Sequence, residues 1–300
     1  MTTADAFLDA LSRKAKIFAP SAIATFEANR PLCSWLLTPL ARWAEAAYGE
    51  CIFDEAALGY AKYCLGVAQA QRIYEKAGLY TPEAMPEIAS GVYEDEAYMV
   101  PYMWAAILIY AFWPSMVEHL ALFRDQFLRH LPRNARLLEL ASGHGVLSLL
   151  AAEERPDITV DGLDISGPAV AVANRLLGVS GHSGRVRFVM QDAIGERPET
   201  STPKYDGIIS AMLAEHLESP QPLFAALARQ VTKNGTIFFS AALESAQRDH
   251  VYEFHRESEP LLMAEKVGLR ASRMVSDASS RPAPQSRFVP RATAMILAPL

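Results

Sequence analysis

The segment Leu137–Gly145 carries the side chains best suited to ligand chemistry in this 300-residue chain. An apolar run contains Glu139 near its end, and a turn with Gly143 and Gly145 then opens a helix. Glycines at such a turn let a ligand approach the backbone closely, and the N-terminal amides of the helix point toward that ligand. The loop therefore predicts a nucleoside-binding site.

The carboxylate of Glu139 narrows the choice of nucleoside. A dinucleotide places its pyrophosphate against the turn, where a carboxylate would repel it. The third glycine of a G-x-G-x-x-G motif is also absent, since Ser148 stands there. A ligand with a cationic amine and no phosphate fits better, and S-adenosylmethionine is such a ligand.

Two more acids follow at intervals of about one strand-helix unit. An expected strand over 159–164 ends in Asp164, where a carboxylate can accept hydrogen bonds from both ribose hydroxyls. A strand over 185–190 leads to Asp192, placed to accept from an adenine amino group, and a fourth strand ends at Ser210. Any one acid is typical of a helix cap, but three at successive strand ends indicate one shared site.

At these residues the chain resembles the class I S-adenosylmethionine-dependent methyltransferases, from about Arg136 to residue 300. The family's glycine motif matches residues 139–145, with Ala141 in place of the first glycine. The small size of alanine makes this a mild departure. The resemblance implies a set of cofactor-binding residues: Glu139, Ala141, Gly143, Gly145, Asp164, Ile165, Asp192, Ala193 and Ser210.

The segment 215–220 looks like the E-H-x-x-x-P stretch that follows the fourth strand in the same family. Many relatives have another acid three residues earlier, where this chain has Met212, which puts a general base at that point in doubt. The resemblance implies an α/β fold with a Rossmann-like seven-stranded sheet flanked by helices, its last strand antiparallel.

The first 131 residues lie outside the part that resembles the family, and their pattern is helical. Residues 31–47 and 53–77 carry apolar side chains three and four positions apart, without strand alternation. We expect two domains: a helical cap and substrate domain over 1–131, and a cofactor-binding catalytic domain over 132–300. The apolar cap helices also suggest a homodimer.

Composition and hydropathy limit the partners. The net charge of −6 leaves no basic stripe, so nucleic acid is not expected as a partner. The three cysteines have no metal-ligand spacing, and the N-terminal residues lack a secretory signal, so a cytoplasmic protein is expected. Residues 97–117 are uncharged and long enough to span a membrane. Because they contain Pro101 and Pro114, we expect a buried helix that covers the active site instead of a membrane-spanning helix.

Candidate catalytic residues lie in the cap and after the fifth strand. Tyr98 and Tyr102 are one helical turn apart, and their aromatic faces suit a sulfonium cation. His250 and Tyr252 are expected to reach the acceptor, and His250 suits proton transfer near neutral pH. A helix cap in this segment is an equal alternative. No metal is predicted, because His250 and His255 have no evident third ligand.

The sequence predicts transfer of the S-adenosylmethionine methyl group to a small metabolite, in a reaction of secondary metabolism. One alternative rests on a looser similarity to azetidine-2-carboxylate synthases, in which the cofactor's own amine displaces methylthioadenosine to close a four-membered ring. A third hypothesis is a degenerate methyltransferase fold that serves as a binding or scaffold module and catalyses no reaction.

Overall fold

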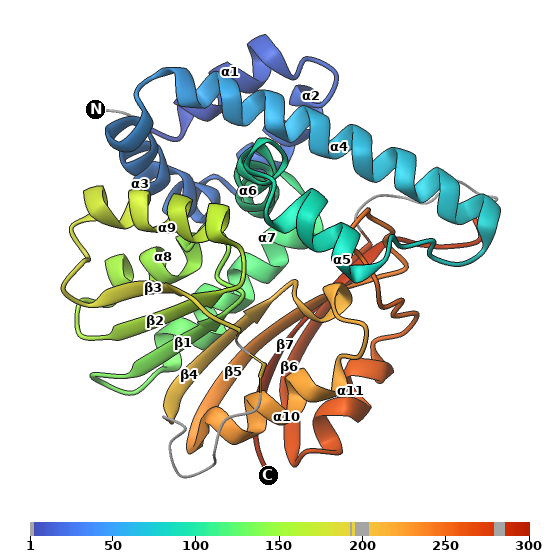
Figure 1. The fold of residues 1–300 in the computed structure, drawn as a ribbon. Helices are drawn as coiled ribbons and strands as arrows, with labels where there is room; N and C mark the ends of the chain where they lie inside the picture. Colours follow the sequence, from blue (N-terminus) through green and yellow to red (C-terminus); the bar gives the residue numbers. More distant parts are fainter. Residues whose placement is uncertain (1–2, 193, 196–203, 279–285) are drawn as a thin grey trace.

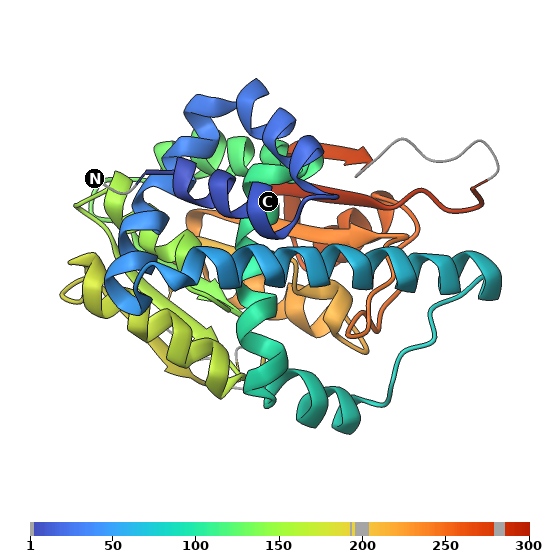
Figure 2. The same cartoon turned by 90° about the horizontal axis from the view of Figure 1, so that it is seen from above.

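We describe residues 3–192, 194–195, 204–278 and 286–300 of a computed structural model. Residues 3–130 form the predicted helical region, and the longest helix, α4, crosses most of the width of the molecule (Figures 1 and 2). The helices of this region are α1 (Asp5–Lys14), α2 (Ala19–Ala28), α3 (Arg30–Tyr48), α4 (Cys51–Ala77), α5 (Met85–Ile88), α6 (Glu96–Phe112) and α7 (Pro114–Ala121), with π-helical turns η1 (Ala89–Tyr93) and η2 (Leu122–Phe127) and a 3-10 turn η3 (Leu128–His130).

The predicted buried helix over 97–117 is broken in two. The side chain of Asp95 caps α6 by accepting a hydrogen bond from the N–H of Ala97. Pro114 pushes Trp113 into an extended conformation and begins α7, so the chain bends by 82° between Glu96–Phe112 and Pro114–His130. Within the described residues, no single helix is long and apolar enough to cross a membrane, and this bent pair qualifies by length and composition only.

The second half forms the seven-stranded sheet that the sequence predicted. Its order is β3-β2-β1-β4-β5-β7-β6, with β1 to β5 parallel and β7 antiparallel to both of its neighbours. The strands are β1 (Arg136–Leu140), β2 (Thr159–Asp164), β3 (Val186–Met190), β4 (Tyr205–Ala211), β5 (Val231–Leu243), β6 (Leu269–Ala278) and β7 (Arg291–Pro299). The helices between them are α8 (Val146–Glu154), α9 (Gly167–Ser180), η5 (Ala214–His216), α10 (Gln221–Gln230) and α11 (Ser258–Glu265).

The helical region and the sheet share one hydrophobic core. Buried side chains of α1, α2, α3, α4, α6 and α7 belong to the same cluster as residues of β1, β2, β3, β4, β5 and β7, and a second cluster packs on the face toward α10 and α11. Helix α6 lies between α4 and the sheet (Figure 1) and also packs against α9. The cap thus sits directly over the carboxyl ends of the parallel strands, where open α/β sheets bind ligands. The division into two domains at residue 131 stays a prediction.

Candidate active site

A cavity of about 190 Å³ opens where the carboxyl ends of β1, β2, β4 and β5 meet helix α6. Its floor comes from the loops that follow those strands, and its roof comes mainly from α6. The sequence-predicted residues that line it are Tyr102, Glu139, Ala141, Gly143, Asp164, Ile165 and His250.

Asp164 ties the glycine loop to the end of β2. One carboxylate oxygen accepts a hydrogen bond from the N–H of Gly143 at 2.8 Å, and the other accepts from the N–H of Ser166 at 2.8 Å. Burial raises the pKa of this carboxyl, and the two backbone donors partly oppose that shift. The residue is 7% exposed, and its carboxylate lies at the cavity wall with lone pairs left for a ligand's hydroxyls.

The turn after β1 requires backbone angles that glycine adopts without strain. Gly143 and Gly145 have φ of +53° and +68°, and a Cβ on Gly145 would lie 2.4 Å from the Phe188 ring. Ala141 also has a positive φ, +51°, at the position where the family has its first glycine. The small size of alanine therefore does not decide how well Ala141 replaces that glycine. The backbone angle matters more, because an alanine in the left-handed region costs about 1–2 kcal/mol.

Glu139 is buried at the cavity floor and faces the start of α8. Its carboxylate accepts hydrogen bonds from the backbone N–H of Ser148, at 3.2 Å, and from the Ser148 hydroxyl. Burial raises the pKa of Glu139 to about 8, although the bonds from Ser148 lower it in part. Ser148, which stands where a dinucleotide motif has its third glycine, is thus the hydrogen-bond partner of Glu139.

Among the described residues, three predicted cofactor residues do not line the cavity: Gly145, Asp192 and Ser210. The Asp192 carboxylate is exposed and accepts hydrogen bonds from the N–H groups of Ile194 and Gly195, so it closes a local turn. Ser210 is buried inside β4 and does not reach the cavity. Ala193 lies outside the described residues.

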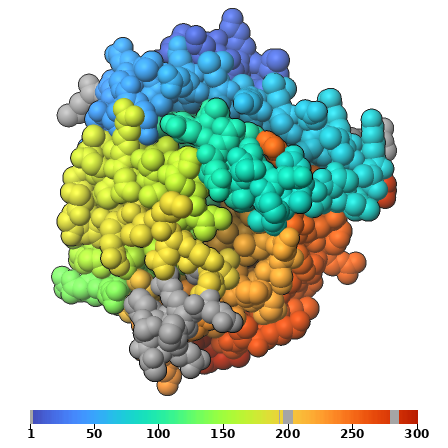
Figure 3. Space-filling view, in the orientation of Figure 1, coloured from blue at the N-terminus to red at the C-terminus, as the bar shows by residue number. Residues whose placement is uncertain are grey.

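The two predicted tyrosines occupy different places. Tyr102 lines the cavity, whereas Tyr98 faces a second cavity of about 640 Å³ between α4, α6 and the segment after β5. In the space-filling view that segment, orange, shows between the surfaces of the N-terminal helices (Figure 3). Burial raises the pKa of both phenols, that of Tyr98 to about 12, so both stay neutral.

A thin wall of side chains separates the two cavities. Tyr63, Tyr102 and Gln247 line both of them. The Gln247 amide donates a hydrogen bond to the Tyr63 hydroxyl at 3.0 Å, and the Tyr63 and Tyr102 rings lie 5.8 Å apart. No sequence motif joins Tyr63 to Gln247, and 184 positions separate them, so their contact could not be predicted.

His250 lines the cavity, and Tyr252 does not. The His250 ring is buried, its Nδ1 lies 2.6 Å from the carbonyl oxygen of Ser245, and burial lowers its pKa to about 4. The Tyr252 ring lies 4.6 Å from the Phe254 ring and packs on the second core cluster. The two side chains therefore lie in different environments.

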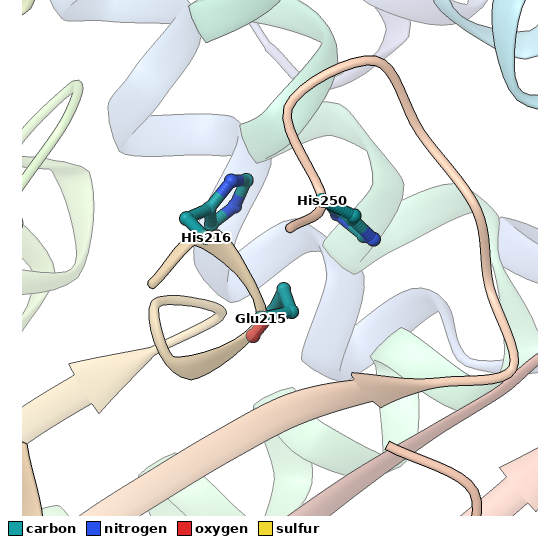
Figure 4. A group of neighbouring side chains, drawn as sticks. All are labelled: Glu215, His216 and His250. Carbon is teal, nitrogen blue, oxygen red and sulfur yellow. The ribbon is translucent and has the colours of Figure 1, made fainter. Parts of the chain in front are cut away.

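The E-H segment contributes directly to the cavity. Glu215 and His216, on η5, both line it, and the His216 ring lies 4.9 Å from that of His250 (Figure 4). Burial raises the pKa of Glu215 to about 7. Burial lowers the pKa of His216, but the neighbouring Asp249 and Glu215 carboxylates outweigh that effect and raise it.

A family model described as a methyltransferase domain matches residues 112–265, about half of the chain. This match confirms the family predicted from the glycine loop and the acidic strand ends. Among curated proteins, the ubiquinone biosynthesis O-methyltransferase of Photobacterium profundum is 30% identical over 112 residues, 37% of this chain and 46% of that protein. A malonyl-[acyl-carrier protein] O-methyltransferase of Halalkalibacterium halodurans is 28% identical over 159 residues, 52% of this chain and 55% of that protein.

The chain thus spans about half the length of the curated relatives it matches. Among solved structures, an O-methyltransferase of neocarzinostatin biosynthesis, NcsB1, aligns with a TM-score of 0.54 and 15% identity over 85% of this chain and 74% of that one. The [4+2]-cyclase SpnF aligns with a TM-score of 0.52 and 13% identity over 77% and 96%. These similarities show the same fold.

Proposed function

The chain belongs to the methyltransferase-domain family, and from this premise we propose that it transfers the methyl group of S-adenosylmethionine to a small metabolite. The observation that carries the proposal is the shared cavity: Glu139, Asp164 and the Gly143 turn form its floor, and Tyr102 and His250 face them. The floor residues are of the types that hold an ammonium group and ribose hydroxyls, and an aromatic face opposite suits a sulfonium.

Positioning and desolvation supply most of the rate in this proposal. Methyl transfer is an in-line displacement, so the enzyme gains by holding the acceptor atom behind the methyl group and by excluding water. The cavity suits this task because its walls are largely apolar and its few polar groups converge from separate strand ends. Two curated relatives are O-methyltransferases, which supports an oxygen atom as acceptor.

The second cavity is our proposed acceptor chamber. It adjoins the cofactor cavity through the wall of Tyr63, Tyr102 and Gln247, and it is rimmed by aromatic side chains. Two cations, Lys62 and Arg248, lie over the Tyr98 ring at 6.0 Å and 5.4 Å, and Arg248 also forms an ion pair with Glu83 at 2.9 Å. Because aromatic surface and positive charge meet here, we propose a small aromatic or anionic metabolite, as in secondary metabolism, as the acceptor.

The two other readings have less support. Ring closure within S-adenosylmethionine needs no acceptor, so it leaves a 640 Å³ chamber next to the cofactor site without a role. A module that only binds would not need polar side chains such as His250 and Glu215 opposite the cofactor residues. The curated relatives also favour methyl transfer.

Incubation of the purified chain with S-adenosylmethionine, analysed by mass spectrometry, tests the proposal. We expect no turnover with the cofactor alone, and S-adenosylhomocysteine once a metabolite extract supplies an acceptor. Formation of methylthioadenosine without any acceptor would show that the chain catalyses the cyclisation and not methyl transfer. Failure of S-adenosylmethionine to bind in calorimetry would favour the hypothesis of a binding module without enzymatic activity.

A further inference from the structure

Three side chains of the active-site cavity form a cluster of metal-ligand types. One ligand atom from each of Glu215, His216 and His250 lies within 4.8 Å of the other two. Glu215 and His216 come from η5, and His250 comes from the loop after β5 (Figure 4). The hydrogen bonds from the N–H groups of Val251 and Tyr252 to the carbonyl oxygen of Glu215 fasten these two segments together.

Both imidazoles are held from behind by the backbone. Nδ1 of His250 lies 2.6 Å from the carbonyl oxygen of Ser245, and Nδ1 of His216 lies 3.0 Å from that of Asp249. A carbonyl only accepts, so each Nδ1 carries a proton and donates, and in the neutral ring each Nε2 keeps its lone pair. Metal-binding histidines are typically oriented in this way by a carbonyl or carboxylate on the second ring nitrogen.

The carboxylates of the cluster lack the hydrogen-bond partners that buried acids normally have. One Glu215 oxygen accepts from the N–H of Ala242, but the other is buried without a hydrogen-bond partner among the described residues. The neighbouring Asp249 also lines the cavity, and both of its carboxylate oxygens are buried without a hydrogen-bond partner among the described residues. Its carboxylate forms an ion pair with Nδ1 of His216 at 3.3 Å. A bound cation would compensate these unpaired buried oxygens.

We propose that Glu215, His216 and His250 bind a divalent first-row transition metal ion. Two imidazoles and one carboxylate suit ions such as Zn²⁺, Fe²⁺ or Co²⁺, whereas Mg²⁺ and Ca²⁺ take mostly oxygen ligands. Bonds of about 2.1 Å place two ligand atoms roughly 3.4–4.2 Å apart, so side-chain rotations need to shorten any pair of these atoms by at most about 1.4 Å. Three protein ligands leave coordination positions open toward the cavity, where an oxygen-bearing ligand can bind.

Titration of the tag-free chain with Co²⁺, without S-adenosylmethionine, tests the metal site independently of methyl transfer. We expect one cobalt ion to bind per chain. Its visible d–d absorption should be typical of cobalt with nitrogen ligands. His216→Gln and His250→Gln should each weaken cobalt binding by more than about 100-fold, because even changes behind a ligand cost about 10- to 100-fold. Glu215→Gln should also weaken it strongly.

His255→Gln is the matched control. His255 is half-exposed and lies within 3.9 Å and 3.6 Å of the Glu244 and Glu253 carboxylates, outside the cavity lining. Cobalt binding that is lost in this variant and kept in the His216 and His250 variants would overturn the proposal, and so would no binding to the unaltered chain. If the ligand variants do not fold, Zn²⁺ must still raise the melting temperature of the unaltered chain, and a chelator must reverse the rise.

Discussion

The floor and the roof of the active-site cavity are built in opposite ways. The part of the floor proposed to hold the cofactor lies between Glu139 and Asp164, a short stretch in which backbone angles and strand ends set the positions of the side chains. The roof and wall bring together Tyr63, Tyr102 and Gln247 from three distant segments, two of them 184 residues apart. The floor is thus determined locally, whereas the roof depends on how the cap helices pack on the sheet.

The largest effect that tests the floor is expected from Asp164→Ala. This change removes the acceptor for the N–H groups of Gly143 and Ser166, and with it the predicted acceptor for the ribose hydroxyls. Hydrogen bonds to a charged group are worth about 1.5–3 kcal/mol each, so affinity for S-adenosylhomocysteine should fall by at least about 100-fold in calorimetry. Asp161→Asn on the same strand serves as the control. Equal affinity in both variants would mean that the floor does not hold the cofactor.

Gly145→Ala tests whether the floor depends on tight packing as well as on backbone angle. Gly145 and Gly181 both have positive φ, but an added Cβ at Gly145 meets the Phe188 ring at 2.4 Å, and one at Gly181 meets nothing within 4 Å. Gly181→Ala should cost about 1–2 kcal/mol of unfolding free energy for the angle alone. Gly145→Ala should cost about 1–3 kcal/mol more for the clash. Equal costs in denaturant titrations would show that Phe188 gives way.

The same contrast explains what could be predicted from the sequence. Strand patterns, the glycine turn and Asp164 are readable because each residue acts through its own backbone and its nearest neighbours. The contact between Tyr63 and Gln247 could not be predicted, since only tertiary packing brings these two residues together. Asp192 and Tyr252 follow strands in the expected way, but local turns direct their side chains away from the cavity.

The charge of Glu139 predicts a pH dependence of cofactor binding. Burial raises the pKa of this carboxyl to about 8, so below that pH it is mostly neutral and above it is charged. A ligand that presents an ammonium group binds the charged form better. Affinity for S-adenosylhomocysteine should therefore rise toward about pH 8, by up to about tenfold per pH unit, which is about 1.4 kcal/mol. Calorimetry on Glu139→Gln should show no such slope; a slope retained in that variant would assign it to another group.

The smallest expected effect separates the two tyrosines of the roof. Tyr102 lines the cofactor cavity, while the Tyr98 ring faces Lys62 and Arg248 in the neighbouring chamber. S-adenosylmethionine carries a sulfonium cation that S-adenosylhomocysteine lacks, so Tyr102→Leu should weaken binding of the first relative to the second. A cation–π contact of about 1 kcal/mol corresponds to roughly fivefold. Tyr98→Leu should leave the ratio of the two affinities unchanged, because its ring is occupied by protein cations. If Tyr102→Leu weakens the binding of both ligands equally, Tyr102 is a packing residue. If the ratio of the two affinities changes in Tyr98→Leu instead, the sulfonium lies in the larger chamber.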